Sequence, residues 1–347
     1  TADNNTAIGR LAGTGLTTGG SNTVLGAAAL QAQTTGSGTV AIGTSALANA
    51  TASGNTAVGY QTGMDLTTAV QNVFLGYQAG ANVTTGNNNV FIGAGAGDAC
   101  TTGTPNTAVG VGAYGAGGAG GGAENVAIGN SVLATADSGA LYNTAIGSTA
   151  GYDVTTGDYN TFVGRYAGTT VTTGSFGIMI GPSSRPSGAT SNSETVIGYN
   201  VAGQGNSTFT LGGGTADTSI VWGATTWTAP SDMRLKEDIK DEEIGLSFIN
   251  DLRPRTFRYR KEKDIPEELD AHVADSEKRY RTETYQHGFI AQEVKEAIDK
   301  HNLKDGFDMW SESPVDGRQR VGETAVIPVL IKAIQELSAD VEKLKGE

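Results

Sequence analysis

Short groups of apolar residues recur along the first two thirds of the chain at an almost constant spacing. Most groups stand between Asn and Gly, as in Asn143-Thr-Ala-Ile-Gly147. The closing glycines are 14 to 19 residues apart, most often 17, and lie at positions 9, 26, 43, 59, 76, 93, 110, 129, 147, 164, 181, 198 and 212. A fixed period of this length indicates a repeat architecture in which each repeat is one structural unit.

Each repeat predicts one or two very short strands joined by tight turns. Gly and Asn punctuate the apolar groups, and both accept the positive φ that tight turns need. The density of glycine opposes a helix, and no 3.6-residue periodicity is present. We therefore predict a β-solenoid or β-roll with one coil for each repeat. One coil buries too little apolar surface to fold alone, so its neighbours must supply burial and ladder hydrogen bonds.

The predicted core of this shaft is thin, because its positions are mostly Ala, Val and Ile. Three chains wound or packed together would bury more surface, so we favour a trimer over a monomeric solenoid. Several tyrosines follow the repeat glycines: Tyr60, Tyr77, Tyr166 and Tyr199. Stacked coils would place some of them in a column that binds glycans, covers the flank of the shaft or fills a trimer seam. The shaft has nine acidic residues, spread along its length. Because a glycosidase needs paired carboxylates, we expect no glycan-cleaving site there.

Composition changes sharply near residue 230. Residues 1–230 hold 45 of the 51 glycines, with 3 basic and 9 acidic residues and a net charge of −6. Residues 231–347 hold 20 basic and 27 acidic residues, net −7. We therefore predict a repetitive β shaft over 1–230 and a small, charged α+β domain over 231–347.

The charge and the cysteine content exclude several classes of function. An acidic chain repels phosphate, so we expect no nucleic-acid partner. The single Cys100 cannot form an intrachain disulfide, and no pattern of metal ligands accompanies it, so we expect no metal and no cofactor. No apolar run approaches the roughly 18 residues of a membrane span. The chain opens inside a repeat without an initiator Met, and we expect it to be a piece of a longer protein.

The last residues of the chain carry a heptad pattern. Apolar side chains alternate spacings of three and four residues at Ile327, Leu330, Ile334, Leu337, Val341 and Leu344. This pattern predicts a coiled-coil helix over 325–345 that brings chains into register, and we assign trimerisation to these six residues. Ile or Val at a with Leu at d favours dimers in isolated peptides, so a dimer is the alternative.

Four motifs after the shaft carry a resemblance to a known family. They are 231–239 (Ser-Asp-Met-Arg-Leu-Lys-Glu-Asp-Ile), 252–259 (Leu-Arg-Pro-Arg-Thr-Phe-Arg-Tyr), 287–294 (His-Gly-Phe-Ile-Ala-Gln-Glu-Val) and 327–337 (Ile-Pro-Val-Leu-Ile-Lys-Ala-Ile-Gln-Glu-Leu). In this order they resemble the C-terminal intramolecular chaperone auto-processing domain of bacteriophage tail fibres and tailspikes. The resemblance covers residues 231–347.

The resemblance implies that this domain helps a trimeric fibre to fold and then cuts itself off with a Ser/Lys dyad. Carried over, Ser231 is the nucleophile, Lys236 is its base, and the bond between Pro230 and Ser231 is cut. A serine hydroxyl needs a neighbour to take its proton, and a lysine can do so only as a neutral amine in a buried site. Five residues of a regular helix would turn the two about 140° apart. We therefore expect an extended or turn segment that folds Ser231 back towards Lys236.

Three polar residues of the third motif are candidates to support the dyad or to orient a water molecule: His287, Gln292 and Glu293. The alternative is that Phe289, Ile290 and Val294 form core and these polar residues are structural.

The resemblance further implies a virion tail protein, assembled in the host cytoplasm and extracellular after release. Its partners would be two further copies of the chain, other tail proteins and a host surface receptor, with a glycan as one candidate. Two alternatives stay open. One is a bacterial trimeric adhesin, since the Asn-Thr-Ala-Ile-Gly units look somewhat like the head repeats of trimeric autotransporters. The other is a fibre whose C-terminal domain is a non-cleaving trimerisation cap.

Overall fold

A computed structural model describes the chain over seven ranges: 3–115, 122–137, 139–214, 216–269, 271–303, 307–314 and 317–346. The chain divides into two compact units, Thr1–Asp232 and Met233–Glu347, and each is described by itself. The first is a β-solenoid, and the second is a small α/β unit that ends in a long helix. The predicted fold class, a repetitive β-solenoid followed by a small α+β domain, is confirmed.

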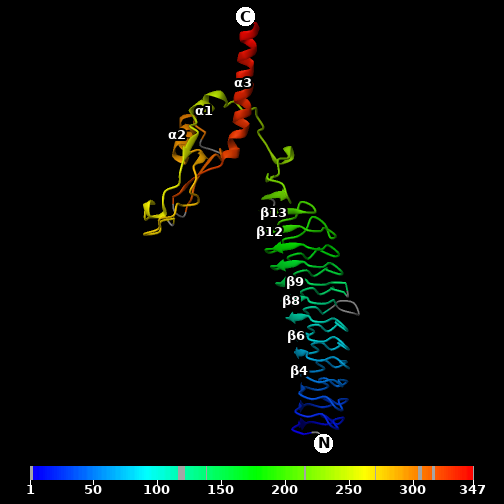
Figure 1. Ribbon diagram of the computed structural model, residues 1–347. Helices are drawn as coiled ribbons and strands as arrows, with labels where there is room; N and C mark the ends of the chain where they lie inside the picture. The colour runs from blue at the N-terminus through cyan, green and yellow to red at the C-terminus, as the bar shows by residue number, and fades with distance from the viewer. Residues whose placement is uncertain are drawn as a thin grey trace. The chain divides into compact units, whose positions relative to one another are not determined.

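The shaft is a single 14-stranded sheet whose strands follow one another in chain order, and Figure 1 shows its coils stacked in that order. Neighbouring strands from β1 to β13 pair in parallel. Each coil up to β11 contributes one strand of three residues, whereas the sequence predicted one or two strands for each coil. The strands are β1 (Thr6–Ile8), β2 (Thr23–Leu25), β3 (Val40–Ile42), β4 (Thr56–Val58), β5 (Val73–Leu75), β6 (Val90–Ile92), β7 (Thr107–Val109), β8 (Val126–Ile128), β9 (Thr144–Ile146), β10 (Thr161–Val163), β11 (Ile178–Ile180), β12 (Thr195–Tyr199), β13 (Thr208–Gly213) and β14 (Ala216–Val221).

The core of the shaft is fuller than the sequence suggested. The middle residue of each strand points inward because successive side chains of a strand alternate sides. Some of these residues are large and fully buried, notably Phe74, Phe91 and Phe162. Leucines from the opposite side of the coils, among them Leu47 and Leu133, are also fully buried. Ala and Val still make up most of the core, as the sequence predicts, and the named coils add aromatic and leucine packing within one chain.

The side of each coil opposite the strand consists of turns that bond to the next coil. Gly80 donates its N–H to the carbonyl of Ala96 at 2.8 Å, one coil further on. Glycine is required where coils approach most closely: Gly76 has a φ of 137°, and a Cβ there would lie 2.6 Å from the carbonyl oxygen of Gly93. The repeat glycine is therefore fixed by both backbone conformation and the distance between coils.

A ladder of buried asparagine side chains joins the coils. The side chain of Asn143 shows the pattern: its Oδ1 accepts the backbone N–H of Asn160 at 3.0 Å, and its Nδ2 donates to the carbonyl of Gly157 at 2.8 Å. The same bonds recur one coil earlier, where Asn125 Oδ1 accepts the N–H of Asn143 at 2.9 Å. Each asparagine thereby satisfies buried backbone groups that the short strands cannot reach.

The stack ends in a different arrangement. Glu194 occupies a position of the asparagine ladder and is fully buried. Its carboxylate accepts the N–H of Ser187 and the N–H of Gly205, both at 2.8 Å. The last strand, β14, pairs antiparallel with β13, whereas all earlier pairs are parallel. This closing strand covers the edge of the parallel sheet, and the sequence pattern did not predict it.

The C-terminal unit packs three helices against two small antiparallel hairpins. The helices are α1 (Leu246–Asp251), α2 (Ala291–Lys300) and α3 (Ile327–Gly346), and the short 3-10 turns are η1 (Met233–Leu235), η2 (Glu262–Asp264) and η3 (Glu323–Val326). The hairpins pair β15 (Arg255–Phe257) with β16 (Gln286–Gly288) and β17 (Trp310–Glu312) with β18 (Gln319–Val321). Phe248, Val294, Met309 and Val329 are buried in one core that joins all three helices. None of the helices in the described part of the chain is long and apolar enough to cross a membrane.

Replacing Asn143 by Ala tests the asparagine ladder. The change leaves the N–H of Asn160 and the carbonyl of Gly157 buried without these partners. We expect the free energy of unfolding to fall by about 1–3 kcal/mol for each buried group left without its hydrogen bond, as measured by chemical denaturation followed by circular dichroism. The matched control is Asn130→Ala, which removes an exposed asparagine of the preceding coil. Equal losses of unfolding free energy in the two variants would show that an asparagine of the ladder stabilises the shaft no more than an exposed asparagine does.

Candidate functional site

The expected cleavage segment is exposed to solvent in the single chain. Every residue from 221 to 243 is exposed. Ser231 has no regular secondary structure, and Lys236 directly follows η1, where its N–H bonds to the carbonyl of Met233 at 3.1 Å. Pro230 and Ser231, the two residues of the expected scissile bond, are exposed as well. The assignment of Ser231 and Lys236 as a dyad remains a prediction.

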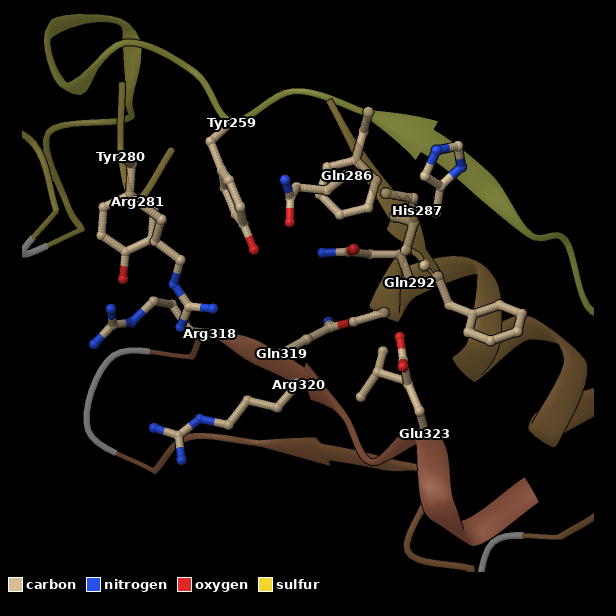
Figure 2. Close-up of a pocket in the computed structure, with 16 residues that line it drawn as sticks. Tyr259, Tyr280, Arg281, Gln286, His287, Gln292, Arg318, Gln319, Arg320 and Glu323 are labelled. Carbon is tan, nitrogen blue, oxygen red and sulfur yellow. The ribbon is translucent and has the colours of Figure 1, made fainter. Parts of the chain in front are cut away.

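A pocket of about 750 Å³ lies in the C-terminal unit, beside the β15–β16 hairpin and the start of α2. Figure 2 shows the amide side chains of Gln286, Gln292 and Gln319 pointing toward the same space as the hydroxyl of Tyr259. Among the described residues, the lining contains no Ser, Cys or Lys. The pocket therefore offers polar binding groups, and neither Ser231 nor Lys236 lines it.

Two of the three supporting candidates, His287 and Gln292, line this pocket. His287 lies on β16 directly opposite Thr256 of β15, and its Nδ1 is 3.1 Å from the Thr256 hydroxyl. In Figure 2 its ring extends to the other side of the strand from Gln286. Gln292 lies in the first turn of α2 and is exposed. The fold brings these two residues to one pocket, and their part in cleavage stays a prediction.

The third candidate, Glu293, is engaged in an ion pair. Its Oε2 accepts from Arg255 Nε at 2.9 Å and its Oε1 accepts from a terminal nitrogen of the same guanidinium at 2.5 Å. This two-point contact joins β15 to α2. The hydrogen bonds from Arg255 lower the pKa of Glu293, and the same hydrogen bonds, followed by the charge of the carboxylate, raise the pKa of Arg255. This two-point ion pair is a structural contact, and a part of Glu293 in cleavage stays a prediction.

The wall of the pocket away from α2 is cationic, with Arg281, Arg318 and Arg320 beside two tyrosines. The Arg281 guanidinium lies 5.7 Å from the ring centre of Tyr259 and 5.6 Å from that of Tyr280. A hydrogen bond with Tyr280 is the main cause that raises the pKa of Arg281. These groups come from three separate segments, and sequence analysis did not single them out. The only signal was the alternation in Arg318-Gln-Arg320.

The six predicted trimerisation residues lie on one exposed face of α3. Their exposed fractions run from 41% to 72%, in Ile327, Leu330, Ile334, Leu337, Val341 and Leu344. A neighbouring face, about a quarter turn away, is buried against the unit through Val329 and Ala333, which are 1% and 3% exposed. Glu336 also accepts the N–H of Leu246, the first residue of α1, at 2.8 Å. The helix is therefore fixed to its own unit by one face and leaves an apolar seam uncovered on the other.

Aromatic side chains form short stacks on the surface of the shaft. Tyr60 and Tyr77, both expected in columns, have ring centres 5.5 Å apart and nearly parallel planes. A longer stack of Tyr142, Tyr159 and Phe176 was not predicted, and its ring centres are 4.7 and 5.2 Å apart. Because stacked rings cover one another's faces, these stacks stabilise neighbouring coils and present mainly ring edges to solvent.

No group of three or more His, Cys, Asp or Glu side chains is placed to hold a metal ion within the residues that the structure describes. Cys100, the lone cysteine, is buried in the shaft, and burial raises the pKa of its thiol to about 11.

Comparison with known families identifies the segment that follows the shaft. Residues 231–303 match the family model described as chaperone of endosialidase. The match begins at Ser231 and spans three of the four motifs, those at 231–239, 252–259 and 287–294. No curated protein and no solved structure matches the chain. A β-solenoid followed by a chaperone-of-endosialidase domain fits a tail fibre or spike that carries its chaperone at the C-terminus.

We expect the ion pair of Glu293 to make the stability of the C-terminal unit pH-dependent. Its pKa in the folded chain lies below the usual value of about 4.3. The pair therefore stabilises the fold above that value and is lost as the pH falls through the lower, folded value. We expect Glu293→Gln to lower the melting temperature at pH 7 by a few degrees, and the difference from the unchanged chain to shrink towards pH 3.

The measurement is thermal unfolding by circular dichroism between pH 3 and pH 7, with Glu296→Gln as control, because Glu296 is an exposed residue of the same helix. A deficit of Glu293→Gln that persists unchanged at pH 3 would contradict the assignment.

Proposed function

We propose that this chain is a segment of a bacteriophage tail fibre or tailspike that serves host attachment. In this proposal the C-terminal domain brings three chains together, helps the shaft to fold, and then cuts the bond between Pro230 and Ser231. The observation that carries it is the place of the family match, which begins at residue 231 where the repeats have ended. The domain therefore follows directly on the part of the chain that would need help in folding.

The exposed seam of α3 supports assembly by this domain. A helix with Leu337 and five other large apolar residues in the a and d positions and outside its own core needs partner helices. The buried Val329 and Ala333 hold the helix on its unit, so joining the seams would join whole domains. The shaft and the globular domain, together with this short coiled coil, would favour a trimer over a dimer.

The proposed cleavage is a balanced hydrolysis. The Oγ of Ser231 attacks the carbonyl carbon of Pro230 while the neutral amine of Lys236 takes the hydroxyl proton. The C–N bond then breaks, the nitrogen of Ser231 gains a proton, and an ester to Ser231 remains. Water hydrolyses this ester, leaves the carboxylate of Pro230, and restores the serine hydroxyl. Each chain acts once, as a self-cleaving serine endopeptidase.

The exposure of the cleavage segment supports a link between cleavage and assembly. A lysine amine in bulk water is protonated and cannot accept a proton. In the single chain both Ser231 and Lys236 are exposed, so burial must come from elsewhere. Contact with the other two copies would provide it, and the cut would then follow assembly.

Mass spectrometry of the purified chain tests self-cleavage. We expect the unchanged chain to yield fragments 1–230 and 231–347, and Ser231→Ala and Lys236→Met each to remain as one full-length chain. Ser247→Ala is the control, because Ser247 is an exposed serine of α1 in the same domain. Continued cutting in Ser231→Ala would refute the assignment of the nucleophile. A trimer of unchanged chains that stays intact would instead favour a non-cleaving trimerisation cap.

Light scattering of Leu337→Lys tests the seam of α3. A charge at a d position faces its own copies across the coiled coil and repels them. We expect the purified chain to shift from trimer towards monomer. Gln335→Lys adds the same charge to the same helix outside the seam and should remain trimeric. A stable dimer of the unchanged chain would overturn the trimer.

A further inference from the structure

One long face of the shaft is apolar, periodic and uncovered in the single chain. It consists of the first and third residues of strands β1 to β11, and we call it the outer strand face. All third residues are Ile, Leu or Val, and all first residues are Thr, Val or Ile. None of these positions is charged or an amide. The middle residues point the other way into the solenoid core, as the buried Ala145 between Thr144 and Ile146 shows.

Several large side chains of this face are well exposed. Leu25 and Leu75 are each 45% exposed, Ile146 is 39%, and Ile128 is 37%. Parallel sheets are normally covered on both faces, and solvent-facing strands normally alternate apolar with polar residues. In the shaft the inner face of the sheet is covered by its own coils, whereas the outer strand face has no cover in the single chain and carries no charged or amide side chain, only Thr, Val or Ile at its first positions and Ile, Leu or Val at its third. The outer strand face therefore has the residue composition of a surface that is buried in an assembly.

The size of the face suits a protein interface. Eleven strands about 4.8 Å apart and about 10 Å wide make a strip of roughly 500 Å². That is near the upper end of the roughly 300–600 Å² found for the largest apolar patch of an ordinary monomer. It approaches the roughly 800 Å² that each partner buries in a stable interface.

The regular spacing of apolar side chains along the outer strand face determines which partner can cover it. An aliphatic side chain recurs at every strand along eleven coils, and the strands pair in unbroken parallel register. A partner that covers such a strip must present apolar groups at the same strand spacing over the same length. Another copy of this chain does so when it lies parallel and in register. The absence of charge at these positions removes like-charge repulsion between copies.

We infer that the outer strand face is the seam along which three copies of the shaft pack, parallel and in register. The inference rests on the proposed trimer and adds to it the surface that the copies share. Equivalent residues of the three copies then face one another across the seam, so Ile146 of one copy lies near Ile146 of the next.

Cysteine crosslinking of the full chain tests this surface. The variant is Ile146→Cys, and the matched control is Asp153→Cys, an exposed residue of the same coil outside the strand. The native Cys100 does not interfere, because it is buried and its thiol has a raised pKa of about 11. We expect mild oxidation with copper phenanthroline to convert most of Ile146→Cys to disulfide-linked pairs, visible on a non-reducing denaturing gel, and Asp153→Cys to remain uncrosslinked.

Light scattering of the same samples distinguishes a failure of the proposed seam from a failure of the proposed trimer. A trimer in which Ile146→Cys crosslinks no more than Asp153→Cys would overturn this seam and leave the proposed trimeric fibre intact. A monomer in both samples would overturn the trimer and the seam together.

A second variant tests the same face without an added thiol. Ile128→Lys/Ile146→Lys places two charges on the face in each copy while leaving the solenoid core unchanged. We expect the thermal transition of the shaft to fall by several degrees and the shaft to become sensitive to protease. The control Asn130→Lys/Asp153→Lys adds lysines to the same two coils outside the strands. Both double variants are made in the Ser231→Ala chain, so that α3 stays attached and holds the trimer. Equal behaviour of the two double variants would refute the seam.

Discussion

The stacking of one coil on the next is the interaction on which the whole shaft depends. A coil of about 17 residues has one three-residue strand and a few buried side chains, and it cannot satisfy its own backbone groups. Strand bonds, turn bonds and asparagine side chains all run from one coil to the next, as the contacts of Asn143 with Asn160 and Gly157 show. The fold is therefore cooperative along its axis, and each coil is stable only between neighbours.

This dependence explains the features at the end of the stack. The asparagine ladder ends at the last parallel strands, β12 and β13, which still pair with each other. There, Glu194 replaces asparagine and binds two backbone N–H groups through one carboxylate. The antiparallel β14 then occupies the edge that a further parallel strand would have taken. Both devices close the ladder, so that the last strand of the solenoid does not offer free backbone groups to another sheet.

Stacking also creates a problem that the second unit is suited to solve. The repeats are so alike that a shift of one whole coil between copies would preserve most contacts along the outer strand face. In our proposal, α3 and the chaperone domain fix the register before the shafts pack. The seam of α3 is exposed, whereas Val329 on a neighbouring face of the helix is buried in the unit. Cleavage at Ser231 after assembly would then leave the shaft held by its own barrier to unfolding.

The sequence by itself determined the features that are local and repeated. The regular recurrence of Gly and Asn identified one coil per repeat, because positive φ and short strands are set within a few residues. The heptads identified the α3 seam for the same reason. Only the tertiary structure decided what depends on neighbours. It decided that Phe74 and Leu47 fill the core, that β14 closes the sheet, and that Arg255 engages Glu293. It also left the third residue of every short strand outside the core, because only the path of the whole coil decides which side of a strand faces inward.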